Sequence, residues 1–241
     1  MNTYKKDYSK LYQLQIKFLH WLQEFGFPFY LTGGTALSRF YLSHRFSNDL
    51  DFFTNGNPDF GKYINKINGR ITRHFDVNVS ESLFTEDFCR FFISEKETNL
   101  KVEFVNDVEY RVGEPHKTKF GLIDTVENIL ANKITAIIGR DEPKDVFDII
   151  YISENYAFNW TDVFLHAKQK SAINEIDFEQ RLHSFPIELL KNIKIFGEMP
   201  DIHLLQSKLI EITNEFLLGN ENRLGIGKYK ISEITPIVDT G

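Results

Sequence analysis

The sequence of 241 residues is acidic, with a formal net charge of −6, and 42% of its residues are hydrophobic. This composition is typical of a globular protein of one or two domains, and 23 Phe and 10 Tyr residues argue against disorder. The acidic balance argues against a surface coated in basic residues for duplex nucleic acid, although it allows a local basic groove. One cysteine, Cys89, excludes an internal disulfide and a zinc site built from several cysteines.

The N-terminal residues, MNTYKKDYSKLYQLQIKF, are polar and periodic, which is not the pattern of a signal peptide. No run approaches the roughly 18 apolar residues that a membrane span needs. We therefore expect a cytoplasmic protein that makes no membrane contact.

The first part of the chain alternates between helical and strand patterns. Apolar residues at helical spacing predict a helix over 8–25, which Gly26 and Pro28 end. The following patterns predict a strand at 29–31, a helix at 35–44, a strand at 48–53, a helix at 59–73 and strands at 74–81, 87–94 and 99–106. The turn at 95–98 predicts a hairpin.

From residue 124 onward the pattern is helical. Asp124 and Glu127 resemble a capping box that begins a helix ending near Ile138. Further helices are predicted at 143–153 and through 160–220, with a strand or tail at 225–241. We expect an α/β (α+β) fold in which a mixed, twisted sheet is flanked by helices. A catalytic domain at 1–156 precedes a mainly helical subdomain at 157–241.

Asp49 and Asp51 are the first candidates for chemistry. They lie two apart on a predicted strand, so alternation places both side chains on one face. Two nearby carboxylates repel each other unless a cation lies between them. Mg²⁺ prefers such oxygen ligands and shares them with substrate phosphates. An exposed carboxylate pair on a strand edge remains the ordinary alternative.

The Gly33-Gly34-Thr35 turn, upstream of Asp49 and Asp51, is a candidate phosphate-binding site. It follows a predicted strand and opens a helix, where glycines let the backbone approach a phosphate and free N–H groups favour anions. Thr35 can cap the helix or reach a phosphate oxygen with its hydroxyl. A plain tight turn with a threonine cap is the alternative.

The segment YLTGGTALSRFYLSHRFSNDLDFF resembles the signature of the AbiEii/AbiGii nucleotidyltransferase toxins. These belong to the minimal nucleotidyltransferase class, which includes DNA polymerase β and the aminoglycoside nucleotidyltransferases. The class motif is Gly-Ser, about ten residues, then Asp-x-Asp. Here Thr35 replaces the serine and the intervening segment is longer. The resemblance covers roughly 29–153 and implies Mg²⁺, or Mn²⁺, as cofactor and an NTP as substrate.

The class usually carries a third carboxylate on a later strand. In LKVEFVND the best match is Glu103, which would bind metal with Asp49 and Asp51 or act as a base. By alternation it shares a face with Lys101, so a solvated Lys–Glu ladder is the alternative. Asp107, just past the strand, is the second candidate.

A later block, ILANKITAIIGRDEPKDVFDIIYI, also resembles the family. Lys133 falls on an apolar helical stripe, where an ammonium needs an anion such as a triphosphate, unless it extends from the edge of the core. Resemblance implies a catalytic and nucleotide-binding role for Lys133 and nucleotide contacts for Arg45, Arg140 and Lys144. Asp145 and Asp148 share one side of a helix, with either a supporting or a catalytic role.

The expected function is transfer of an NMP from an NTP to an acceptor hydroxyl. Family resemblance implies the toxin of a toxin–antitoxin or phage-defence system, with a cognate antitoxin and with RNA (tRNA) or protein as acceptor. Arg70, Arg73, Lys191 and Lys194 are candidates for a local RNA path. The alternatives are a small-molecule (aminoglycoside-type) nucleotidyltransferase and a non-catalytic binding protein of the same fold.

Overall fold

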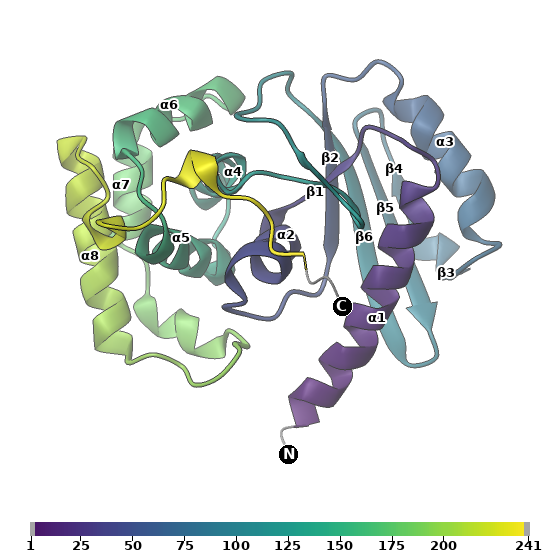
Figure 1. Ribbon diagram of the computed structural model, residues 1–241, viewed down its shortest axis with the longest axis horizontal. Coiled ribbons are helices and arrows are strands. Elements are labelled where there is room, and N and C mark those ends of the chain that lie inside the picture. Colours follow the sequence, from purple (N-terminus) through teal and green to yellow (C-terminus); the bar gives the residue numbers. More distant parts are fainter. Residues whose placement is uncertain (1–2, 239–241) are drawn as a thin grey trace.

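The computed structural model describes residues 3–238, with side chains from Tyr8 onward, and sets a mixed sheet beside a layer of helices (Figure 1). The α-helices of this part of the chain are α1 Thr3–Gln23, α2 Gly33–Leu37, α3 Phe60–Ile71, α4 Val126–Gly139, α5 Pro143–Asn155, α6 Trp160–Lys170, α7 Glu175–His183 and α8 Ile202–Leu218. Shorter turns are the π-helical η1 Ser38–Leu42 and the 3-10 segments η2 Val79–Glu81, η3 Ile187–Asn192, η4 Arg223–Gly225 and η5 Ile231–Glu233.

The sheet confirms the predicted mixed architecture. Its strands are β1 Tyr30–Thr32, β2 Leu50–Asn55, β3 Asp76–Val77, β4 Leu83–Phe84, β5 Phe88–Glu95, β6 Thr98–Asp107, β7 His116–Thr118 and β8 Gly121–Ile123. They lie in the order β3-β5-β6-β2-β1-β8-β7, with β4 pairing with β5. The pair β2–β6 is parallel, whereas β1–β2 and the hairpin β5–β6 are antiparallel.

Alternation along β2 divides its side chains between the core and a cavity. Leu50 and Phe52 are buried in the core, where Phe52 packs against Phe18 of α1 and Phe104 of β6. Asp51 and Phe53 point the other way and line a cavity beside the helical layer. The apolar residues thus fix which face of the strand carries the carboxylate. Helices α1 and α3 lie on the side of the sheet away from that layer (Figure 1).

Helices α4 to α8 form the second layer (Figure 1). The helical layer begins at Val126, and the expected division after residue 156 lies between α5 and α6. One continuous hydrophobic core joins the two layers, from Leu14 of α1 to Phe216 of α8. The shared core holds the helices at a fixed place beside the sheet.

Several local predictions are corrected. The helix expected at 35–44 begins at Gly33 and continues as a π-helix, and β3 covers only two of the residues expected at 74–81. Thr125, not Asp124, caps α4, because the Asp124 carboxylate accepts hydrogen bonds from Thr32 and Asn128. Of the two alternatives for 225–241, a strand or a tail, the described residues 225–238 form a tail with the 3-10 segment η5, and residues 239–241 lie outside the described chain.

Candidate active site

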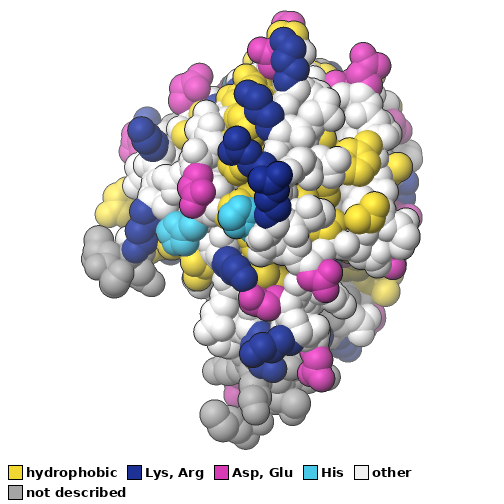
Figure 2. All heavy atoms as spheres, turned by 90° about the vertical axis from the view of Figure 1, so that its right-hand side faces the viewer, with side chains coloured by type: hydrophobic (Ala, Val, Ile, Leu, Met, Phe, Trp, Pro, Cys, Tyr) yellow, Lys and Arg dark blue, Asp and Glu magenta, His cyan; other side chains and the backbone are white. Residues whose placement is uncertain are grey.

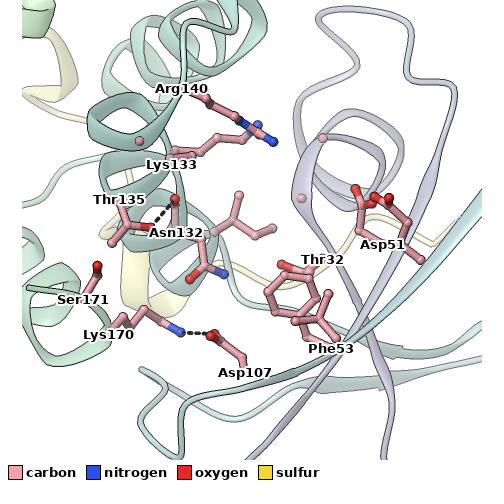
Figure 3. A pocket seen from close by; sticks show the side chains of 17 residues that line it. Thr32, Asp51, Phe53, Asp107, Asn132, Lys133, Thr135, Arg140, Lys170 and Ser171 are labelled. Carbon is pink, nitrogen blue, oxygen red and sulfur yellow. Dashed lines mark hydrogen bonds and ion pairs between the residues drawn. The ribbon is translucent and has the colours of Figure 1, made fainter. Parts of the chain in front are cut away.

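A cavity of about 620 Å³ lies between the sheet and the helical layer (Figure 3). Strands β1, β2 and β6 form one wall, and α4 with the end of α6 forms the other. Its lining residues are Thr32, Gly33, Gly34, Asp51, Phe53, Glu103, Val105, Asp107, Ile129, Asn132, Lys133, Thr135, Ala136, Gly139, Arg140, Lys170 and Ser171. The size of the cavity suits a small polar ligand.

Asp51 lies on the strand wall of this cavity, and Glu103 is its neighbour. In the parallel pairing of β2 and β6, the two residues are directly opposite each other. Asp49 precedes β2 and keeps 40% of its side chain exposed. Burial, together with the charges of Asp49 and Glu103, raises the pKa of Asp51 to about 7. The described residues provide the Asp51 carboxylate with no hydrogen-bond donor or ion-pair partner.

Glu103, in contrast, is well paired. Arg90 Nη2 lies 2.6 Å from its Oε1 and Lys101 Nζ lies 3.0 Å from its Oε2. Burial alone would raise the pKa of Glu103, but the hydrogen bonds from Lys101 and Arg90 lower it. Lys101 Nζ also lies 3.2 Å from Asp49 Oδ2 and so bridges the two carboxylates. Of the two candidate carboxylates on β6, Glu103 lies beside Asp51 in the strand register, whereas Asp107 is four residues further along β6.

The Gly33-Gly34-Thr35 turn lines the cavity with its glycines only. Gly33 has a φ of +66°, and a Cβ there would lie 2.9 Å from Asp51 Oδ2. At Gly34 a Cβ would overlap the Arg45 guanidinium. Thr35 is buried, and its hydroxyl contacts Ser47 Oγ and the backbone carbonyl of Asp49. Its hydroxyl therefore connects the turn to the strand carrying the aspartates, and Thr35 does not line the cavity.

Arg45 is also turned away from the cavity. Its Nε and Nη2 donate to the two oxygens of Asp148 at 2.6 and 2.7 Å, and only 2% of the residue is exposed. His44 Nε2 lies 2.7 Å from Asp148 Oδ1. Burial would raise the pKa of Asp148, but Arg45 and Lys133 hold it well below its ordinary value. Arg45 thus holds the helical layer against the turn, and a direct nucleotide contact is not what this geometry shows.

Lys133 connects this buried network to the cavity. Its Nζ lies 2.6 Å from Asp145 Oδ1 and 2.7 Å from Asp148 Oδ2. Arg140 Nη2 lies 2.9 Å from Asp145 Oδ2, and 61% of the Arg140 side chain is exposed at the cavity. Figure 3 shows both side chains facing the cavity, Lys133 from α4 and Arg140 from the residue just after it. Three cations, Arg45, Lys133 and Arg140, therefore share the two carboxylates of Asp145 and Asp148.

Lys144 is not brought to this cavity. It is exposed at the start of α5 and lines a separate groove with Tyr8, Phe46 and Asn192. Three other lining residues were not singled out from the sequence. Thr32 and Asn132 lie inside the two blocks that resemble the family, and Lys170 lies outside them. Lys101 was visible only as the neighbour of Glu103 by alternation.

The carboxylates are chemically suited to a divalent cation. Carboxylate oxygens are hard ligands, and the unpaired Asp51 charge beside Asp49 and Glu103 calls for a positive counter-ion. Within residues 3–238, no three acidic, histidine or cysteine side chains converge into a metal site of their own. Asp49, Asp51 and Glu103, the expected metal ligands, therefore do not form such a group in the described part of the chain.

The described chain contains no helix that is both long enough and apolar enough to cross a membrane. Among curated proteins, no sequence matches this one.

Two solved structures share the fold. JHP933 from Helicobacter pylori has 20% identity, covers 90% of this chain and 95% of its own, and has a TM-score of 0.55. MenT4, a nucleotidyltransferase toxin from Mycobacterium tuberculosis, has 14% identity, covers 87% of this chain and 82% of its own, and has a TM-score of 0.58.

The family model described as nucleotidyl transferase AbiEii toxin of the type IV toxin–antitoxin systems matches residues 20–201. This range includes the glycine turn, the Asp49–Asp51 strand and the Lys133–Asp148 network. The chain therefore belongs to the AbiEii family of nucleotidyltransferase toxins, enzymes that use an NTP and are paired with a cognate antitoxin.

Proposed function

We propose that this nucleotidyltransferase moves an NMP from an NTP to an acceptor hydroxyl in a reaction that depends on Mg²⁺, or on Mn²⁺ in its place. The observation that supports this most is the unpaired Asp51 carboxylate on the cavity wall, directly opposite Glu103. An enzyme that consumes NTP would work in the cytoplasm.

Asp49 and Asp51 would hold the cation, with Glu103 as a third ligand. Mg²⁺ would supply charge neutralisation on the triphosphate and make the α-phosphate a better electrophile. The lowered pKa of Glu103 keeps it anionic, as a metal ligand must be, and makes it a weak acceptor for a proton. We therefore favour the ligand role over the base role for Glu103.

The remaining residues would position the triphosphate. Gly33 and Gly34 line the cavity without side chains, so phosphate oxygens can approach their backbone closely. Arg140 is the exposed cation at this end and can form paired hydrogen bonds with phosphate oxygens. Lys133, held between Asp145 and Asp148, adds a fixed charge at the same wall. Lys144 would act only outside this cavity.

The proposed reaction is an in-line transfer of the NMP. The acceptor oxygen loses its proton to a base and forms a bond with the α-phosphorus, while the bond from that phosphorus to the β-phosphate bridging oxygen breaks. Pyrophosphate leaves in line with the attack, and the NMP remains on the acceptor. The chain's own residues contribute orientation and charge, which are the main contributions that proteins make to phosphoryl chemistry.

For the acceptor, we propose RNA, with tRNA as the first candidate. The support for this choice is a basic face, present despite the net charge of −6, on the side of the sheet away from the cavity (Figure 1), so a bound RNA would have to extend around the sheet to the site. Figure 2 shows Lys and Arg side chains in a line on the side of the molecule where α3 lies, and this helix exposes Lys62, Lys66 and Arg70. Neutralising backbone phosphates with such residues gives sequence-independent affinity. Protein is the second acceptor candidate.

A labelling experiment tests the proposal. The purified protein is incubated with each α-labelled NTP and Mg²⁺, and separately with total RNA, total protein and a panel of aminoglycosides. We expect label in the RNA fraction that disappears when EDTA is added. Label on an aminoglycoside alone would establish the small-molecule alternative. Label on none of the three, with no NTP-dependent thermal stabilisation, would favour a non-catalytic binding protein.

A further inference from the structure

The cavity has two chemically different ends. One end carries Asp51, Glu103 and the cations Lys133 and Arg140. Strand β6 then runs from Glu103 to Asp107, which at the ordinary rise of a strand is about 13 Å. Figure 3 shows Asp107 and Lys170 at the opposite side of the cavity from Arg140. The proposed function uses only the first end, so the second has room for another part of the ligand.

The walls between the two ends are apolar. Phe53 of β2 and Val105 of β6 are directly opposite each other in the sheet, and both line the cavity. Ile129 of α4 lines it from the helical side. A slot with an aromatic ring on one wall suits a flat heterocycle, because bases gain binding energy from stacking on such rings.

An unpaired donor lies at this second end. The Nδ2 atom of Asn132 is buried and has no hydrogen-bond partner among the described residues. Its side chain extends from α4 into the cavity, in the space between Lys170 and Thr32 (Figure 3). A buried N–H group without an acceptor is costly, so its presence in a ligand cavity indicates that a ligand supplies the acceptor.

Lys170 adds a second donor. Its side chain is 3% exposed, and its Nζ lies 3.1 Å from Asp107 Oδ2 and 3.3 Å from the Tyr110 carbonyl oxygen. An ammonium carries three protons, so these two contacts leave one for a ligand. Asp107 thereby acquires a role distinct from that of Glu103, because it fixes the ammonium at the far end of the cavity.

We propose that this end binds the nucleoside of the NTP, and that Asn132 and Lys170 select bases carrying a ring carbonyl oxygen over adenine. Guanine, cytosine and uracil each present a carbonyl oxygen that two converging N–H donors can share. Adenine has no carbonyl oxygen, and each of its ring nitrogens has a single lone pair, which accepts from one donor and not from two. This inference rests on the proposed use of NTP, and it makes Asn132 a specificity-determining residue.

Binding measurements without turnover test the inference. Affinities of wild type, Asn132→Ala and Asn132→Asp are measured by calorimetry for non-hydrolysable analogues of the four NTPs and for inorganic tripolyphosphate, all with Mg²⁺. Asn68→Asp is the matched control, because Asn68 is exposed on α3, outside the cavity. Thermal unfolding of each variant shows that it is folded.

We expect wild type to bind at least one carbonyl-bearing analogue about 10-fold or more tightly than the ATP analogue, which is the change in affinity expected from one net hydrogen bond. Asn132→Ala should lose most of this preference and Asn132→Asp should weaken or reverse it, with tripolyphosphate affinity unchanged. A wild-type preference in folded Asn132 variants would overturn the inference, as would equal affinity of wild type for all four analogues. Failure to bind both tripolyphosphate and the analogues would instead overturn the proposed function.

Discussion

Arg45 and Asp148 form a buried, two-point ion pair that joins the turn before the aspartate strand to helix α5. Both hydrogen bonds are short, at 2.6 and 2.7 Å, and both side chains are almost fully buried. The same Asp148 carboxylate also contacts His44 and Lys133. The Arg45–Asp148 ion pair therefore holds the helical wall of the cavity against the glycine turn.

Removal of the Asp148 charge should destabilise the protein strongly. Asp148→Asn leaves Arg45 and Lys133 buried with less negative charge around them, which typically costs about 3–5 kcal/mol when one partner of a buried pair is lost. Urea unfolding measures this change in the free energy of unfolding. Asp141→Asn is the control, because Asp141 pairs with Arg181 on the surface with 82% of its side chain exposed. A change at Asp148 as small as at Asp141 would contradict the structural role.

Gly34 should not tolerate alanine. The added methyl group would meet the Arg45 guanidinium, which cannot move aside because it is fixed to Asp148 and to the Phe46 carbonyl oxygen. We expect Gly34→Ala to lower the free energy of unfolding by about 1–3 kcal/mol, as overpacking does.

Gly69→Ala is the matched control for Gly34→Ala. Gly69 lies in α3 with nothing within 4 Å of an added Cβ, so alanine should stabilise the protein by up to about 1 kcal/mol. Denaturant unfolding of the two variants gives the comparison. Equal and small effects at the two positions would show that the Arg45 contact with the turn is not needed.

Asp51 should make the metal-free protein less stable as the pH rises. Its pKa is raised from 3.8 to about 7 in the folded protein, so between these values the folded state holds a proton that the unfolded state has released. The free energy of unfolding therefore falls as pH rises through this window. Asp51→Asn lacks this term and should be more stable than wild type near pH 8, by on the order of 1–3 kcal/mol because the carboxylate is only partly buried.

Urea unfolding in EDTA, at about pH 5 and about pH 8, measures this effect. The difference in stability between Asp51→Asn and wild type should grow with pH and shrink when Mg²⁺ replaces EDTA. The same pH dependence in both proteins would mean that Asp51 ionises normally.

Lys101 should compete with the divalent cation. Its ammonium lies 3.2 Å from Asp49 and 3.0 Å from Glu103. It thus occupies the position between two carboxylates that a divalent cation would take. Without it, both carboxylates are available to metal, so Lys101→Met should bind Mn²⁺ about 10-fold more tightly, a change of about 1.4 kcal/mol.

Electron paramagnetic resonance of free Mn²⁺ measures the affinity directly, without turnover. Lys17→Met is the control, because Lys17 pairs with Glu95 on the surface, away from the cavity. Unchanged or weaker Mn²⁺ binding by Lys101→Met would show that Lys101 does not occupy the metal's place.

Local patterns in the sequence predicted the elements that carry the site. Pro143 and the apolar stripe after it predicted α5, and the alternation in 99–106 predicted β6. Short strands such as β8, with three residues, have too little alternation to be recognised. The local sequence made Asp124 a candidate helix cap. The hydrogen bond from Thr32, 92 residues away, that engages its carboxylate cannot be predicted from a local pattern.

The sequence named residues that line the cavity, but not their contacts. The Asp-x-Asp motif and the glycine turn are local patterns, and Asp51, Gly33 and Gly34 lie at the cavity. The register of Asp51 with Glu103 depends on which strands pair, and the contact of Arg45 with Asp148 spans 103 residues. For the same reason, the sequence suggested a phosphate contact for Thr35 and Arg45, whereas the fold uses both to hold the strand and helix in place.

The most direct test of nucleotidyl transfer at Asp51 is the rate at which labelled NMP reaches the acceptor, measured for wild type, Asp51→Asn and Asp162→Asn. Asp162 is an exposed carboxylate at the start of α6 and serves as the control. Loss of a cation ligand removes several kcal/mol of transition-state stabilisation, so Asp51→Asn should lower the rate by on the order of 10³-fold or more, while Asp162→Asn keeps it. A folded Asp51→Asn protein that transfers NMP at the wild-type rate would contradict the central claim.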